Sequence, residues 1–230
     1  MLPMITAHSG SDGFEDNSLA YVRYALASGA DCLEVDVRRG PDGKLMLGHD
    51  AADAALPSLE EVFTLLAETP KMGINCDLKE PGLEEAVCAL TEAKGLRGRV
   101  LLTGTVDMRR WAASPELHEV AALWANIEEL LPDFDREQVK EPACREQAAA
   151  EAVRLCRELG IDTVNSWYGL ADEAFLACFR RAGIALSLWT VNEEDALRRY
   201  LRAGVKSITT RKPKLALALR EGIKRKGSES

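Results

Sequence analysis

The stretch from Asp31 to Asp50, DCLEVDVRRGPDGKLMLGHD, has the pattern of a β-hairpin. Side chains alternate along a strand, so Glu34 and Asp36 point to one face and the apolar residues at 33, 35 and 37 to the other. The Gly-Pro-Asp-Gly sequence at 40–43 is a turn signal, and a second short apolar run then leads to His49. A hairpin of this length would return His49 to the two carboxylates. Such a group resists burial unless a positive charge lies within it, so the stretch predicts a divalent cation.

Taken alone, the acid pair is more typical of solvated side chains on an exposed sheet face, because charged residues are mostly exposed. A strand with one buried face would show the same flanking apolar residues. The cation-binding interpretation therefore depends on the polar residues elsewhere in the chain.

Outward from this hairpin, strand patterns alternate with amphipathic helical patterns, and several of these helices end at glycine. Eight strand–helix units in a row, with one hairpin strand after the second strand, predict an α/β fold: a single-domain TIM (β/α)8 barrel. The alternative is an open doubly wound sheet. That fold is expected to carry a G-x-G-x-x-G loop after the first strand, and the sequence contains none.

The predicted barrel strands span 4–7, 32–37, 72–78, 100–103, 120–124, 161–164, 184–189 and 205–209, with the hairpin strand at 45–47. The segment 126–141 is acidic and reads as irregular, and the last helix is expected at 213–223. The barrel domain therefore covers residues 1–223, and the polar residues 224–230 are expected to form a disordered tail.

Composition excludes several kinds of partner. The 230 residues carry a formal net charge of −8, which argues against nucleic acid or an anionic membrane. The sequence shows neither a secretion signal nor an apolar run long enough for a bilayer, so we expect a cytoplasmic protein without membrane insertion. The six cysteines lie inside strand and helix patterns without metal-like spacing, which suits reduced, packed thiols. Oligomeric state is left open.

The active site of a TIM barrel lies at the C-terminal ends of its strands. One set of polar and aromatic residues falls at those ends in this chain: His8, Glu34, Asp36, His49, Asp77, Lys79, Trp167 and Trp189. The third histidine, His118, precedes the fifth strand and is expected at the surface. A lone histidine is more often structural than catalytic. The grouping of so many such residues on one rim favours an active site.

Several segments resemble one known family, in chain order: MITAHSG, GADCLEVDVRRGPDGKLMLGHD, INCDLKE, LSLWTVNEE and GVKSITTRKP. Together they resemble the glycerophosphodiester phosphodiesterase (GDPD) family from about residue 4 to 213. The resemblance implies a TIM barrel that cleaves a small-molecule glycerophosphodiester into glycerol 3-phosphate and an alcohol, with Mg²⁺ or Ca²⁺ as cofactor. It also implies roles for six residues: metal ligands at Glu34, Asp36 and Asp77, an acid–base pair at His8 and His49, and a phosphate contact at Lys79.

The chemistry of these residue types agrees with the implied roles. Three carboxylates suit a hard cation that prefers oxygen ligands. A lysine adds a point charge for the phosphate. Imidazole titrates near neutrality, so one histidine could take a proton while the other gives one, and either could be the base.

The sequence also departs from the family pattern. Ser9 follows the first histidine where arginine is usual, and Asp16 replaces a glutamate. Ser9 removes a bidentate phosphate contact that one lysine does not replace. We therefore expect Arg38, Arg39 or Arg211 to supply part of the positive charge at the substrate. Arg38 has the best alternation to face the site, although a solvated surface arginine is an equal alternative.

Two tryptophans at the rim, Trp167 and Trp189, are interpreted either as an apolar wall for the alcohol moiety or as rim packing. The favoured function is a metal-dependent phosphodiester hydrolase, with a lysophospholipase D-like enzyme as a variant. The competing class is a non-catalytic or regulatory barrel that binds phosphodiesters. Ser9, Asp16 and the short segment between Asp50 and Pro57 are the features that suggest it.

Overall fold

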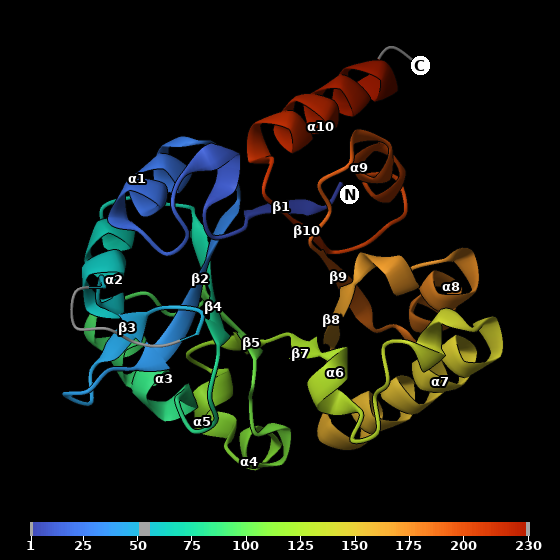
Figure 1. The fold of residues 1–230 in the computed structure, drawn as a ribbon, viewed down its shortest axis with the longest axis horizontal. Helices are drawn as coiled ribbons and strands as arrows, with labels where there is room; N and C mark the ends of the chain where they lie inside the picture. Colours follow the sequence, from blue (N-terminus) through green and yellow to red (C-terminus); the bar gives the residue numbers. More distant parts are fainter. Residues whose placement is uncertain (1, 51–55, 229–230) are drawn as a thin grey trace.

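The computed structural model describes residues 2–50 and 56–228. Its strands form a ring with the helices outside it (Figure 1). In chain order the strands are β1 (Met4–Ala7), β2 (Cys32–Arg39), β3 (Leu45–Leu47), β4 (Gly73–Leu78), β5 (Val100–Gly104), β6 (Ala122–Leu123), β7 (Ala125–Asn126), β8 (Thr163–Trp167), β9 (Ala185–Trp189) and β10 (Ser207–Thr210).

The α-helices surround this ring. They are α1 (Leu19–Ala27), α2 (Leu59–Ala67), α3 (Glu84–Ala93), α4 (Met108–Ala112), α5 (Pro115–His118), α6 (Ile127–Leu130), α7 (Pro142–Leu159), α8 (Glu173–Ala182), α9 (Glu194–Tyr200) and α10 (Pro213–Ser228). Three short 3-10 turns complete the described elements: η1 (Ser11–Gly13), η2 (Gln138–Lys140) and η3 (Tyr168–Leu170).

The strands pair in the order β6-β5-β4-β2-β1-β10-β9-β8-β7, and every neighbouring pair on this path is parallel. The two end strands, β6 and β7, follow each other in sequence and are separated only by Trp124. Together they form one barrel strand, in which β6 pairs with β5 and β7 pairs with β8. The predicted TIM barrel is confirmed. The single predicted strand 120–124 is wrong in its bounds, because the chain changes partner at Trp124.

The predicted hairpin is also confirmed, since β3 pairs antiparallel with β2 and Val37 lies opposite Leu47. Gly43 has a φ of 80°, a left-handed conformation that glycine adopts without a steric penalty. The backbone N–H of Gly40 donates to the carbonyl of Lys44 at 2.7 Å and closes the turn. The turn therefore fixes the register that carries the chain back toward the end of β2.

The two faces of β2 differ in chemistry, and this difference orients the site. Leu33, Val35 and Val37 are fully buried in the hydrophobic core. Because side chains alternate along a strand, Glu34 and Asp36 must point the other way, into the barrel. Small polar side chains share this inner face; the Thr6 hydroxyl, for example, lies 3.1 Å from the Ser207 hydroxyl. The barrel interior is polar, and apolar packing lies between the strands and the helices.

Two predictions for the C-terminal half of the chain differ from the structure. The segment 126–141, read as irregular, holds α6 and η2, with Ile127 and Leu130 buried. The last helix does not end at residue 223, because α10 continues to Ser228. The division into a domain at 1–223 and a disordered tail at 224–230 stays a prediction. Within the described residues, no helix combines the length and the hydropathy needed to cross a bilayer.

Candidate active site

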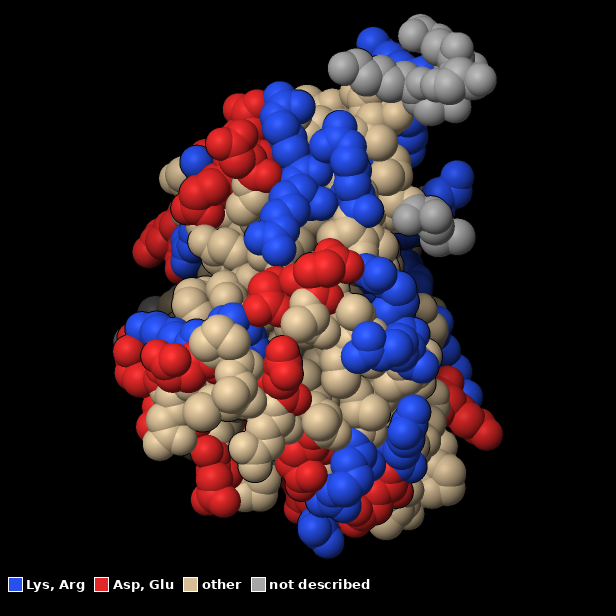
Figure 2. Space-filling model, turned by 90° about the vertical axis from the view of Figure 1, so that its right-hand side faces the viewer, with Lys and Arg blue, Asp and Glu red and all other residues tan. Residues whose placement is uncertain are grey.

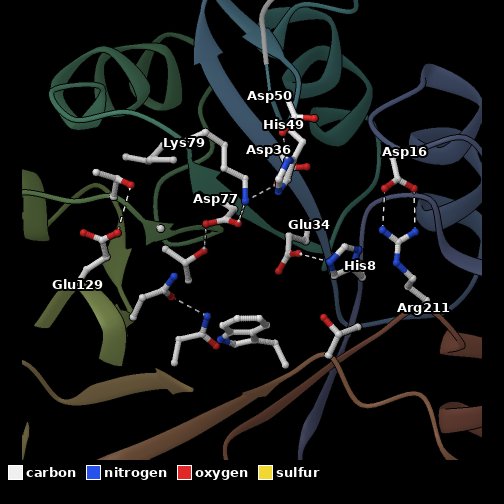
Figure 3. A pocket seen from close by; sticks show the side chains of 18 residues that line it. His8, Asp16, Glu34, Asp36, His49, Asp50, Asp77, Lys79, Glu129 and Arg211 are labelled. Atoms are coloured by element: carbon white, nitrogen blue, oxygen red, sulfur yellow. Dashed lines mark hydrogen bonds and ion pairs between the residues drawn. The ribbon is translucent and has the colours of Figure 1, made fainter. Parts of the chain in front are cut away.

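The two strands that carry the acidic residues lie side by side, with Glu34 opposite Asn75 and Asp36 opposite Asp77. Paired residues of parallel strands point to the same face, so three carboxylates converge at the C-terminal rim (Figure 3). The Asn75 amide donates to Glu34 Oε2 at 2.9 Å. The structure therefore brings together the three acids that the sequence predicts as metal ligands.

Asn17 fixes the position of Asp36. Its amide donates to Asp36 Oδ2 at 2.7 Å, and its side-chain oxygen accepts from the Asp36 backbone N–H at 2.9 Å. Asn17 is buried and has a φ of 58°, a conformation that asparagine tolerates better than most residues. Asn17 was missed from the sequence; the residue after it, Ser18, caps α1 by accepting from the Tyr21 backbone N–H. The signal that could have indicated Asn17 in the sequence was an asparagine directly before a serine that caps a helix.

Lys79 lies between two of the acids. Its Nζ atom is 2.6 Å from Asp77 Oδ2 and 3.0 Å from Asp36 Oδ1. Burial disfavours the charged ammonium, but the Asp77 and Asp36 carboxylates outweigh it and raise the pKa of Lys79 above its usual value. The ammonium thus offsets part of the negative charge gathered at the rim.

The remaining negative charge is only partly compensated. Burial raises the pKa of Glu34 to about 7; nearby His8 opposes this rise, and Asp77 and Asp36 add to it. Burial also raises the pKa of Asp77, even though Lys79 pulls it down. Carboxylates that are costly to ionise where they lie are expected where a cation binds.

The two predicted catalytic histidines both lie at this rim and are held alike. His8 Nδ1 is 2.9 Å from the Ser9 carbonyl, which leaves Nε2 at 3.6 Å from Glu34 Oε1. His49 Nδ1 is 2.7 Å from Asp50 Oδ1, and 66% of its side chain is exposed. In each ring an oxygen acceptor engages Nδ1, so Nε2 is the nitrogen free for proton transfer.

A pocket of about 710 Å³ opens over these groups. It is lined by His8, Asp16, Glu34, Asp36, His49, Asp50, Asp77, Leu78, Lys79, Thr103, Gly104, Thr105, Asn126, Glu129, Asn165, Trp189, Thr190 and Arg211. Glu129, on α6, was missed from the sequence because it lies in the segment that read as irregular. Figure 3 shows it across the pocket from His8.

Four residues that the sequence offered as substrate contacts are not among those that line the pocket: Ser9, Arg38, Arg39 and Trp167. Ser9 is buried, and its carbonyl contacts His8. Arg38 donates from Nε to the His49 carbonyl at 2.9 Å and pairs with Glu80, so it braces the loop that carries His49. A substrate contact by Ser9 or Arg38 stays a prediction.

The tryptophans flank an arginine. The guanidinium carbon of Arg136 lies 5.6 Å from the ring centre of Trp167 and 5.5 Å from that of Trp189. Trp189 lines the pocket, whereas Trp167 does not. The indole N–H of Trp189 is buried and has no hydrogen-bond partner among the described residues. The role of Trp189 as a substrate wall stays a prediction, as does that of Trp167.

His118 lies away from the pocket, as the sequence indicates. Its ring stacks on Trp111 with the centroids 5.0 Å apart, and Nε2 is 2.8 Å from the Trp111 carbonyl.

The donor set suits a hard divalent cation, because Glu34, Asp36 and Asp77 supply only oxygen ligands and carry excess negative charge. As the side chains lie, no three acidic, histidine or cysteine residues of the described chain form a metal-holding group. The Lys79 ammonium pairs with the Asp36 and Asp77 carboxylates. The residues fit a metal in kind, and a bound cation would share them with Lys79.

The Glycerophosphoryl diester phosphodiesterase family model matches the chain over residues 8–141 and 56–215. A glycerophosphodiester phosphodiesterase of Bacillus altitudinis is 26% identical, and the match covers 96% of this chain and 99% of the relative. One of Arabidopsis thaliana is 24% identical, with 96% of this chain and 74% of the relative covered.

Solved structures share the fold. A glycerophosphodiester phosphodiesterase from Parabacteroides distasonis superimposes with a TM-score of 0.74 at 15% identity, covering 96% of this chain and 98% of the other. An Oleispira antarctica phosphodiesterase, solved with its product sn-glycerol-3-phosphate, superimposes with a TM-score of 0.70 at 18% identity, covering 96% and 97%. At these identities the likeness establishes the barrel.

The fold and the family match together define a phosphoric diester hydrolase built on a TIM barrel. More specifically, the chain belongs to the glycerophosphoryl diester phosphodiesterase family, whose model matches most of its length.

Proposed function

We propose that this protein hydrolyses glycerophosphodiesters to glycerol 3-phosphate and an alcohol in a reaction that depends on Mg²⁺ or Ca²⁺. The observation that carries the proposal is the convergence of Glu34, Asp36, Asp77 and two histidines on one pocket of a family member. The phosphodiesterase names of the Bacillus and Arabidopsis relatives support the substrate class.

Glu34, Asp36 and Asp77 would hold the metal. A bound divalent cation would engage a phosphoryl oxygen and offset charge in the transition state. The hydrogen bonds from Asn17 to Asp36 and from Asn75 to Glu34 keep these carboxylates aimed into the pocket. Lys79 adds an ammonium that can donate to a second phosphate oxygen.

His8 and His49 divide the proton transfers. One imidazole takes the proton from the attacking oxygen, which belongs to water or to the substrate's own glycerol hydroxyl. The new P–O bond forms as the bond to the alcohol breaks, and the other imidazole gives a proton to the departing alkoxide. When the glycerol hydroxyl attacks, the first product is a cyclic phosphodiester, which a water then opens to glycerol 3-phosphate. Nε2 is the working atom in both rings, because Nδ1 is engaged by Ser9 in one and by Asp50 in the other.

The direct test is to incubate the purified protein with glycerophosphocholine and with glycerophosphoethanolamine and to follow glycerol 3-phosphate. Each reaction is run with Mg²⁺, with Ca²⁺ and with EDTA. We expect release that EDTA abolishes and that His8→Ala removes, while His118→Ala retains it. Binding of phosphodiesters without turnover across a wider panel would instead indicate a non-catalytic barrel.

A further inference from the structure

The described residues that line the pocket include six carboxylates but only two residues with a permanent positive charge, Lys79 and Arg211. Lys79 is already engaged by two of the acids. A phosphodiester is anionic, and its phosphomonoester product carries more charge. The site therefore needs further positive charge at the phosphate, and Arg211 is the residue placed to supply it.

Arg211 is held rigidly at the C-terminal end of β10. Its backbone N–H donates to Asn192 Oδ1 at 2.9 Å, and its carbonyl accepts from the Asp12 N–H at 2.8 Å. Its guanidinium forms a two-point pair with Asp16, with NH1 to Oδ1 at 2.8 Å and NH2 to Oδ2 at 2.6 Å. Figure 3 shows this pair on the same side of the pocket as His8.

Asp16 is itself seated by the local backbone. Gly10 has a φ of 68°, and a Cβ at this position would collide with the Asp16 carboxylate. The glycine lets Asp16 lie against the chain just after Ser9, where it meets a side chain from the far end of the sequence. The pair thus joins the first barrel loop to the last one.

The pair with Asp16 leaves hydrogen-bond donors of Arg211 unused. A guanidinium has five N–H donors, and the contacts with Asp16 use two of them. No side-chain partner is found for the other three within 2–50 and 56–228, and 40% of the side chain is exposed. Asp16 raises the pKa of Arg211, and Asp36 and Glu34 add to the effect, which places the guanidinium within the electrostatic reach of the acid cluster.

We propose that Arg211, aimed by Asp16, is the second phosphate-binding cation of this site. It provides the guanidinium contact that Ser9 cannot make, from the opposite end of the chain. This inference rests on the proposed function for its substrate class, but it concerns anion binding and can be tested without turnover. The ligand chemistry is a phosphate group bearing a glycerol moiety.

The alternative is that the Arg211–Asp16 pair only ties the barrel ends together. The chain offers a matched control for that case. Arg220 pairs with Asp31, also across most of the sequence, and this pair joins α10 to the start of β2. Neither residue lines the pocket. Removing Arg220 therefore breaks a long-range Arg–Asp pair without touching the site.

The test is calorimetric titration of the full-length protein with glycerol 3-phosphate and with inorganic phosphate, alongside thermal unfolding. We expect Arg211→Ala to weaken both affinities about 10- to 100-fold, the range for charge-assisted hydrogen bonds, while Arg220→Ala leaves them unchanged. In turnover, Arg211→Ala should raise KM far more than it lowers kcat, and Arg211→Lys should restore part of the affinity.

Three results would overturn the inference: unchanged binding in Arg211→Ala, equal losses in Arg211→Ala and Arg220→Ala, or a wild type that binds neither ligand. A protein that binds glycerol 3-phosphate through Arg211 but hydrolyses no glycerophosphodiester would refute the proposed function and leave this anion site standing.

Discussion

The ammonium of Lys79 lies 2.6 Å from Asp77 Oδ2, one of the three carboxylates proposed to hold a metal. Only 19% of the Lys79 side chain is exposed. Removing it as Lys79→Met leaves buried carboxylates without their partner, so we expect a loss of about 3–5 kcal/mol in the free energy of unfolding in EDTA. Saturating Mg²⁺ or Ca²⁺ should recover part of the loss, because the cation replaces the missing charge. Urea unfolding with and without metal measures both effects.

Lys94 is the control for that measurement, because its ion pair with Glu60 joins the end of α3 to α2 and Glu60 is well exposed. Figure 2, which shows the opposite side of the molecule, has charges of both signs spread over the surface there as well. Lys94→Met is expected to change stability by less than about 1 kcal/mol and to show no dependence on metal. A loss in Lys79→Met no larger than this would mean that the ammonium does not balance the acid cluster.

Glu34 gives a pH dependence with a defined sign. Its pKa is raised to about 7 in the folded protein from 4.5, so the folded state holds a proton that the unfolded chain has released between these values. Stability in EDTA should therefore fall as pH rises through that window. Glu34→Gln lacks this proton, so its stability relative to wild type should increase from about pH 5 to about pH 8. Denaturant titrations at both pH values measure the difference.

Glu61→Gln provides a comparison of opposite sign, because hydrogen bonds from the backbone and hydroxyl of Ser58 lower the pKa of Glu61. That variant should lose stability relative to wild type as pH rises through the acid range up to about 4.5, and the difference should then stay constant from about pH 5 to about pH 8. The account of Glu34 fails if its variant and wild type keep a constant difference across the range.

The effect of replacing a histidine on kcat should depend on whether that histidine lies at the pocket. His8→Asn and His49→Asn are each expected to lower kcat by about 10²- to 10⁴-fold, the usual contribution of general acid–base catalysis. His118→Asn, which alters a ring stacked on Trp111 away from the pocket, should retain activity. Steady-state assays of glycerol 3-phosphate release measure all three. An active His8→Asn enzyme would remove His8 from the proton transfers.

Asn17 is expected to be sensitive to charge. Asn17→Asp places a carboxylate where an amide donates to Asp36 at 2.7 Å, so two buried acids then face each other. We expect a loss of about 2–4 kcal/mol in the free energy of unfolding near neutral pH. The loss should shrink on acidification, because the introduced carboxyl group can donate again once it is protonated. A loss that is independent of pH would point to backbone strain at position 17 rather than to charge.

Much of the site could be predicted from sequence because its rules are local. The alternation at Glu34 and Asp36, the Gly43 turn and the position of His49 follow from strand and turn geometry over short separations. Parallel pairing of neighbouring strands then brings Asp77 beside Asp36. Each of these steps needs only chain direction and the period of a strand.

Other features depend on tertiary packing and could not be read from the chain. The clamp by Asn17 requires a left-handed backbone, and nothing in the local pattern specifies which residue it will hold. Asp16 and Arg211 meet only because the barrel closes. The alternation that made Arg38 the favoured cation is correct, yet Glu80 and the His49 carbonyl claim its guanidinium.

At Trp124 the chain changes its pairing partner from β5 to β8. The strands before and after it, β6 and β7, are each paired through only two residue pairs. Asn126 and Glu129 follow directly and line the pocket, and Figure 3 shows Glu129 across from His8. The acids lie instead on two long, fully paired strands. The side of the pocket that carries Glu129 is therefore joined to the rest of the barrel by fewer backbone pairs than the side that carries Glu34, Asp36 and Asp77.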